Sequence, residues 1–194
     1  MKKRMFVALV LTILVLTMAG STSALAGPPP KTTGGVQFSM IYMSPDLDGN
    51  PISSRNWGQW NVVDHGGSAK GWYTWMSKSQ YGWIRMTTKV DCATFFEDAA
   101  GVPTAVFVGE ITSIQPPEPP EWVLEPTFWF YPGQFVKILA HDEGSPGWDG
   151  DQIGFYLDLD VPGGSASFAS RPSCGPDGFS VSLPVYAGNL VVHD

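Results

Sequence analysis

Apolar and polar residues alternate with a period of two along much of the chain. Residues 36–42 read VQFSMIY, so that a valine, a phenylalanine, a methionine and a tyrosine recur at every second position. Successive side chains of a β-strand point to opposite faces of a sheet, and a half-buried strand therefore shows this alternation. The pattern predicts a strand over residues 36–42.

Similar alternation predicts eight further strands, at residues 57–63, 69–76, 82–90, 105–112, 134–141, 152–159, 179–183 and 189–193. Glycine or proline interrupts every stretch with helical spacing of apolar residues, and the sequence holds 22 glycines and 17 prolines. We expect an all-β fold with antiparallel pairing, because the connections are too short for the crossovers that parallel strands need. A single-domain β-sandwich and a flattened barrel both fit this pattern.

The first 26 residues have the parts of a secretory signal peptide. A basic start, KKR, precedes an apolar run that ends in the small-residue sequence ALA. A membrane anchor is the alternative, but the run is shorter than the ~20 residues that a spanning helix needs. We expect a secreted protein with no membrane span after cleavage, a flexible leader at residues 27–35 that is rich in proline and glycine, and a β-domain at residues 36–194.

Two cysteines, Cys92 and Cys174, follow the predicted signal peptide. An even number of cysteines in a chain bound for an oxidising compartment predicts a disulfide, and two cysteines allow a single pairing. The alternative, a nucleophilic thiol, would need a nearby histidine and a reducing environment. We therefore expect one disulfide between Cys92 and Cys174.

The balance of charges is acidic. Eleven basic and 18 acidic residues give a formal net charge of −7. The signal region contains three of the basic residues and none of the acidic ones, so the mature chain would be more acidic still. A surface of this sign repels phosphate groups, which argues against nucleic acids and anionic membranes as partners.

An acidic segment between two predicted strands is the first candidate site. Residues 141–151 read HDEGSPGWDGD, and the four carboxylates of Asp142, Glu143, Asp149 and Asp151 could supply oxygen ligands to a calcium ion. Acidic residues are also common in solvated hairpin turns that bind nothing. A site here would be weak, because the two ends of the hairpin cannot turn all four side chains toward one ion. We expect no other cofactor.

Tryptophans form the second candidate site, since the chain contains eight of them. Exposed indoles on a sheet can stack against sugar rings, which makes Trp72, Trp75 and Trp148 candidate ligand-binding residues. Trp72 and Trp75 are an odd number of positions apart, so they should face opposite sides of a regular strand. The alternative is core packing, which large aromatic residues also favour.

Signals of catalysis are missing from the sequence. It contains no G-x-S-x-G elbow, H-E-x-x-H helix or G-x-x-x-x-G-K-[ST] loop. Each of its three histidines stands beside an aspartate, and neighbours on a strand point to opposite faces, where they cannot orient one another. We do not expect an enzyme.

Four segments follow one another along the chain: WNVVDHGGSAKGWYTWM, TTKVDCATFFEDAAGVPTAVFVGEI, FVKILAHDEGSPGWDGDQIGFYL and the terminal AGNLVVHD. Together and in this order they resemble a family of small secreted β-rich bacterial proteins that have no assigned activity. The resemblance covers residues 36–194 and implies that Cys92 pairs with Cys174 and that Asp142 and Asp151 bracket a hairpin. The chain departs from the family in a proline-rich insertion around residues 115–126 and in its tryptophan content.

These features predict a secreted, non-catalytic β-domain that binds an extracellular ligand or serves a structural role. The alternative is a carbohydrate-binding or carbohydrate-active protein that uses exposed tryptophans and the acidic loop. A glycan is the ligand class that the tryptophans indicate.

Overall fold

The computed structural model describes residues 28–45, 51–66, 68–80, 82–118, 130–144, 150–158, 160, 165–178 and 180–193. The predicted signal peptide at residues 1–26 and the candidate site residues Trp148 and Asp149 lie outside these ranges. Among the described residues, none of the elements is a helix that could cross a membrane.

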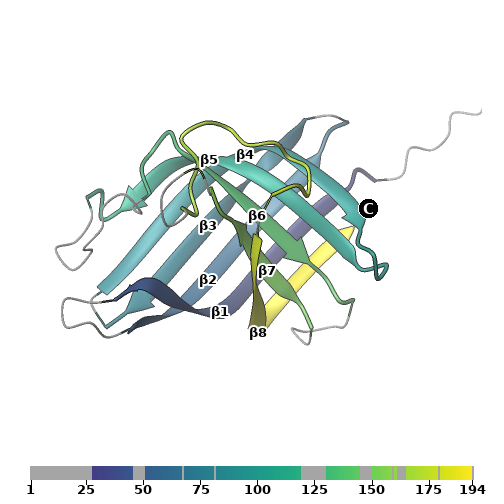
Figure 1. Ribbon diagram of the computed structural model, residues 1–194. Helices are drawn as coiled ribbons and strands as arrows, with labels where there is room; N and C mark the ends of the chain where they lie inside the picture. Colours follow the sequence, from purple (N-terminus) through teal and green to yellow (C-terminus); the bar gives the residue numbers. More distant parts are fainter. Residues whose placement is uncertain are drawn as a thin grey trace, which may run out of the picture.

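Eight antiparallel strands form a closed barrel in the order of the sequence (Figure 1). They are β1 (Lys31–Pro45), β2 (Pro51–Asp64), β3 (Ala69–Ser79), β4 (Gly82–Glu97), β5 (Pro103–Gln115), β6 (Phe135–His141), β7 (Gln152–Tyr156) and β8 (Ser180–His193). Each strand pairs with the next, and β8 pairs with β1 to close the ring. The all-β prediction is confirmed, and of the two expected architectures the barrel is the one that forms.

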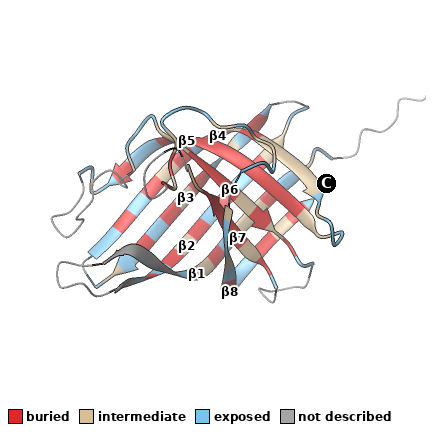
Figure 2. Ribbon diagram, viewed as in Figure 1, coloured by how far each residue is buried: buried red, intermediate tan, exposed pale blue. Residues whose placement is uncertain are grey.

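The barrel interior is filled with side chains. Along the long strands buried and exposed residues alternate, as the banding of β2 and β3 in Figure 2 shows. Eight strands enclose a space just wide enough for side chains to fill. The largest fully buried side chains are those of Trp60, Tyr73, Phe38, Phe107, Met86, Ile111, Ile138, Ile153, Leu190, Val36, Val62 and Val90.

β1 begins at Lys31, whereas the sequence predicted a strand from residue 36. The packing of three buried aromatic rings explains this difference. Trp60, Tyr73 and Phe107 pack with ring centroids 6.1–6.4 Å apart. The indole of Trp60 lies over Gly34, where any Cβ would overlap it. Residues 31–35, predicted to belong to a flexible leader, are therefore paired with β2 and β8. Gly34 makes room for this large ring instead of loosening the chain.

The last two predicted strands form one continuous strand, β8. Two separate strands were predicted, at residues 179–183 and 189–193. Pro184 is exposed, and the chain continues past it with the Val185 N–H donating to the Asp151 carbonyl over 3.0 Å. Gly188 has a φ of 115° and approaches the Gly35 backbone so closely that a side chain would not fit. The register with β1 shifts next to this point, between Ala187 and Val185, so that Tyr186 is an extra residue on β8.

A segment between β7 and β8, residues 165–178, crosses the outside of the barrel, and we call it the strap (Figure 1). Phe168 exchanges two backbone hydrogen bonds with Phe135. Farther along, the Tyr156 hydroxyl donates to the Pro176 carbonyl over 3.1 Å. Beneath the strap, outward-facing residues of β5–β7 are buried, so that this wall has a second buried layer outside the main core. It includes Val106, Val108, Lys137 and Tyr156.

The predicted disulfide joins the strap to β4. Cys92 and Cys174 are bonded, with their Cα atoms 6.1 Å apart. Val90 faces the core, and a register shift between Val90 and Cys92 turns Cys92 to the outside, where it pairs with Val108. The bulge therefore brings the cysteine within reach of the strap.

Candidate functional site

The acidic hairpin connects β6 to β7, and two of its carboxylates are buried. Asp142 is 7 % exposed and accepts hydrogen bonds from the backbone N–H groups of Gly144, over 2.8 Å, and Val192, over 2.9 Å. Val192 belongs to β8. Asp142 therefore fastens the hairpin to the strand that closes the barrel.

Asp151 lies at the other end of the same hairpin and is 1 % exposed. Its Oδ1 accepts the Glu143 N–H over 3.1 Å, whereas its Oδ2 has no hydrogen-bond partner among the described residues. Burial raises the pKa of Asp151, the bond from the Glu143 N–H opposes this rise, and the nearby Asp142 adds to it. An ionised Asp151 is thus held at an energetic cost.

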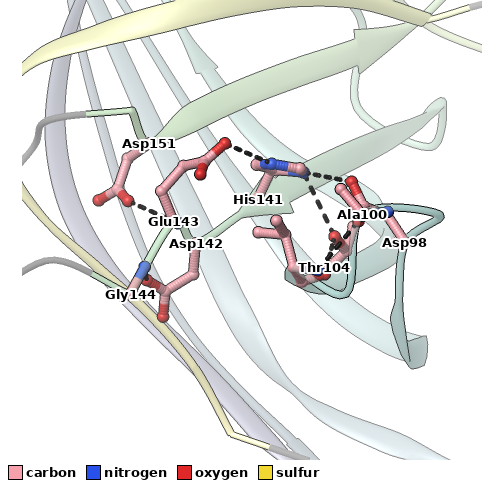
Figure 3. Close-up of polar contacts among 9 residues, drawn as sticks. Asp98, Ala100, Thr104, His141, Asp142, Glu143, Gly144 and Asp151 are labelled. Atoms are coloured by element: carbon pink, nitrogen blue, oxygen red, sulfur yellow. Dashed lines mark hydrogen bonds and ion pairs between the residues drawn. The ribbon is translucent and has the colours of Figure 1, made fainter.

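The structure describes three of the four predicted calcium ligands, and each of these carboxylates has a different partner. Glu143 turns to His141, with its Oε1 3.2 Å from Nε2, while Asp142 and Asp151 engage backbone N–H groups (Figure 3). Asp149 lies outside the described residues. No cluster of three or more acidic, histidine or cysteine side chains that could hold a metal occurs within the described ranges. Calcium binding by the hairpin remains a prediction.

Sequence reasoning missed a polar cluster around His141. The Nδ1 atom lies 3.3 Å from the Thr104 hydroxyl and 3.7 Å from the Asp98 carboxylate (Figure 3). Asp98 belongs to the β4–β5 turn, where bonds from the Val102 and Ala100 N–H groups lower its pKa. The sequence contained one signal of this cluster: His141 and Glu143 are two residues apart, so an extended chain places them on one face. The contact with Asp98 depends on the fold.

This cluster has the residue types of a catalytic triad, but its polar groups contact one another and the backbone. The Thr104 hydroxyl donates to the Val102 carbonyl over 3.0 Å and is part of a residue that is 1 % exposed. A nucleophile needs a free lone pair facing a substrate. Because both ring nitrogens of His141 face partners, the cluster ties the β4–β5 turn to β6.

Trp72 and Trp75 face opposite sides of β3, as predicted. Trp75 lies in the barrel, where its Nε1 donates to Asn56 over 3.1 Å and its ring packs edge-on against Phe130. A ligand on the outside cannot contact it. Trp72 is 39 % exposed on the outer face, and Trp83, which the predicted platform did not include, is 52 % exposed. Trp148 lies outside the described residues.

Exposed indoles and cations share the outer face of β1–β4. Residues directly opposite one another on neighbouring strands lie on one side of the sheet, with Cβ atoms about 5 Å apart. The register places these residues in five cross-strand rows, which we together call the basic face. The rows are Arg55–Lys78–Trp83, Trp57–Met76–Arg85, Gln59–Thr74–Thr87, Asn61–Trp72–Lys89 and Lys31–Val63–Lys70.

The basic face concentrates the positive charge of the protein. The structure describes eight lysines and arginines, and six of them belong to this face; the other two, Lys137 and Arg171, lie at the strap. No acidic residue occupies any of its five rows. Glu110, opposite Lys89 on β5, marks the edge. The ion pairs found among the described residues involve none of the six cations.

The described residues therefore define a closed eight-stranded antiparallel barrel with a basic, aromatic outer face on β1–β4 and a disulfide-linked strap over β4–β7. No known protein family matches the chain, and neither a curated protein nor a solved structure is significantly similar to it. Its function has to be inferred from its own residues.

Proposed function

We propose that this protein is an exported, non-catalytic binding domain whose ligand is anionic and docks on the basic face. The observation that carries the proposal is the gathering of six cations without ion-pair partners among the described residues, beside three tryptophans and a methionine. A fully buried cation needs a carboxylate partner, whereas the six cations of this face are exposed and need none. Here the six are left available to a partner.

A non-catalytic role is supported by the use of the acidic groups. Asp142 and Asp151 accept hydrogen bonds from backbone N–H groups, and His141 is enclosed by Asp98, Thr104 and Glu143. Export is supported by the disulfide, because such bonds persist in oxidising compartments. Recovery of the protein from outside the cell with both cysteines oxidised is the expected result. A reduced protein retained inside would contradict export.

Cation-exchange chromatography tests the basic face. At pH 7 the formal net charge is −7, so a protein with evenly spread charge would pass through a sulfonate resin. We expect this protein to be retained at low salt, because the basic face can turn toward the resin. A Lys70→Gln/Lys78→Gln/Lys89→Gln variant should not be retained, whereas the Arg171→Gln control should behave like the original. Passage of the original protein through the resin at low salt would refute the proposal.

A further inference from the structure

The arrangement within the basic face indicates the class of the ligand. We infer that the ligand is an acidic polysaccharide, a chain of sugar rings carrying carboxylate or sulfate groups; this inference rests on the proposed function. Three features lead to it: the pairing of indoles with cations, the spacing of these pairs along the strands, and the uncharged row between them.

Among the described residues, each of the two most exposed indoles has a cation directly opposite on the neighbouring strand. Trp83 lies opposite Lys78, and Trp72 lies opposite Lys89. The apolar face of a sugar ring stacks on an indole, and an anionic substituent at the ring edge then meets an ammonium group a few ångströms away. A neutral sugar would use the indole alone, and a small anion would use the cation alone. The pair fits a ligand that has both features.

The two pairs are spaced for a polymer. Lys78 and Trp72 both point outward from β3 and are six residues apart, which corresponds to about 20 Å along a strand. Between these rows lies the row of Trp57, Met76 and Arg85, which again combines an indole with a cation. One small molecule cannot span this length, whereas a chain of several sugar rings can contact all three rows.

The remaining row between the indoles is uncharged and rich in hydrogen-bonding groups. It consists of Gln59, Thr74 and Thr87. Amide and hydroxyl side chains match the hydroxyl groups of a sugar ring. A nucleic acid strand carries a phosphate at every nucleotide and is favoured by continuous cationic tracks, so a row without charge fits it less well.

Affinity electrophoresis provides the test, with polygalacturonate in the gel as the acidic polysaccharide and dextran as the neutral one. We expect polygalacturonate to retard the protein and dextran to leave it unchanged. Trp72→Ala should weaken binding about tenfold, through the loss of one stacking contact, and Lys78→Gln/Lys89→Gln should weaken it at least as much, through the loss of two ionic contacts. Tyr186→Ala on β8 is the control for loss of an exposed aromatic ring, and Arg171→Gln is the control for loss of a cation; both should bind normally.

Other outcomes separate this inference from the proposed function. Equal retardation by dextran would overturn the acidic character of the ligand. Binding that depends on the lysines but not on Trp72 would overturn the sugar while leaving an anion-binding face in place. Tighter binding to a single-stranded oligodeoxynucleotide or to anionic vesicles than to polygalacturonate would do the same. Retention on the cation exchanger without any binding to polygalacturonate would refute the polysaccharide and leave the proposed function standing.

Discussion

Replacing Asp142 by alanine tests whether the acidic hairpin is part of the barrel's closure. In the structure this carboxylate holds the Val192 N–H of β8 and the Gly144 N–H of its own turn. Val192 is 6 % exposed, so its N–H would be left without a partner, at a cost of about 1–3 kcal/mol. Gly144 is exposed, and water can replace its bond at little cost.

One effect opposes this loss. Asp142 contributes to the raised pKa of Asp151, so removing its charge relieves some of the repulsion between the two carboxylates. We therefore expect the free energy of unfolding to fall by about 1–2 kcal/mol, near the lower part of the range for an unsatisfied buried group. For a chain of this size each kcal/mol lowers the melting temperature by about 2–4 °C.

Urea denaturation followed by tryptophan fluorescence measures the change, and hydrogen exchange of the Val192 amide locates it. Asp142→Asn is the matched control, since one acceptor oxygen remains, and about half of the loss is expected. Adding about 1 mM calcium in place of a chelator should hardly move the melting temperature, because any site here would be weak. If Asp142→Ala is as stable as the original protein and the Val192 amide keeps its protection, the reasoning is wrong.

Three further changes test other parts of the structure. Because burial raises the pKa of Asp151, its charge costs stability above that pKa and nothing below the pKa of an unfolded aspartate, about 4. Asp151→Asn should thus be more stable than the original near pH 7 and equal to it near pH 4; an equal difference at both pH values in denaturation series would contradict this. Serine in place of both Cys92 and Cys174 should cost about 4 kcal/mol in the same assay, since the bond spans 82 residues; an unchanged midpoint would count against it. Gly34→Ala should destabilise the barrel by about 1–3 kcal/mol because its Cβ overlaps an indole, whereas Gly35→Ala, with open space around its Cβ, should not; equal melting temperatures for the two would refute the packing argument.

Much of the fold could be predicted from the sequence because alternation is a local property. The strands expected between residues 57 and 159 all form, although β2 begins at Pro51 and β4 ends at Glu97, beyond the predicted bounds. Closure into a barrel could not be predicted, because it depends on β1 pairing with β8, about 150 positions away. In the sequence, the glycines and prolines near β1 and β8 looked like ends of strands. They are tolerated because Trp60 fills the space at Gly34 and because a register shift accompanies Gly188.

The candidate sites show the same limit. Acidic residues close together in sequence suggested one site, yet each carboxylate contacts a different partner in the folded protein. For Asp142 that partner is the Val192 N–H, 50 residues away, and for Glu143 it is His141. The opposite orientations of Trp72 and Trp75 depend only on strand periodicity and were predicted. Which of their neighbours carry charge depends on the register between strands, which the sequence does not contain.

The basic face has a local charge opposite in sign to the net charge of the chain. A sum over the chain treats every charge as equally close to a ligand. At physiological ionic strength, however, charges farther away than about 8 Å are largely screened, so a ligand on β2–β4 interacts mainly with the cations of those strands. The carboxylates of Asp142 and Asp151 lie on the β6–β7 hairpin, outside its five rows. Although the protein as a whole is acidic, binding of an anionic ligand to this face should therefore weaken steeply as salt is added. The affinity of the Lys78→Gln/Lys89→Gln variant should depend less steeply on salt.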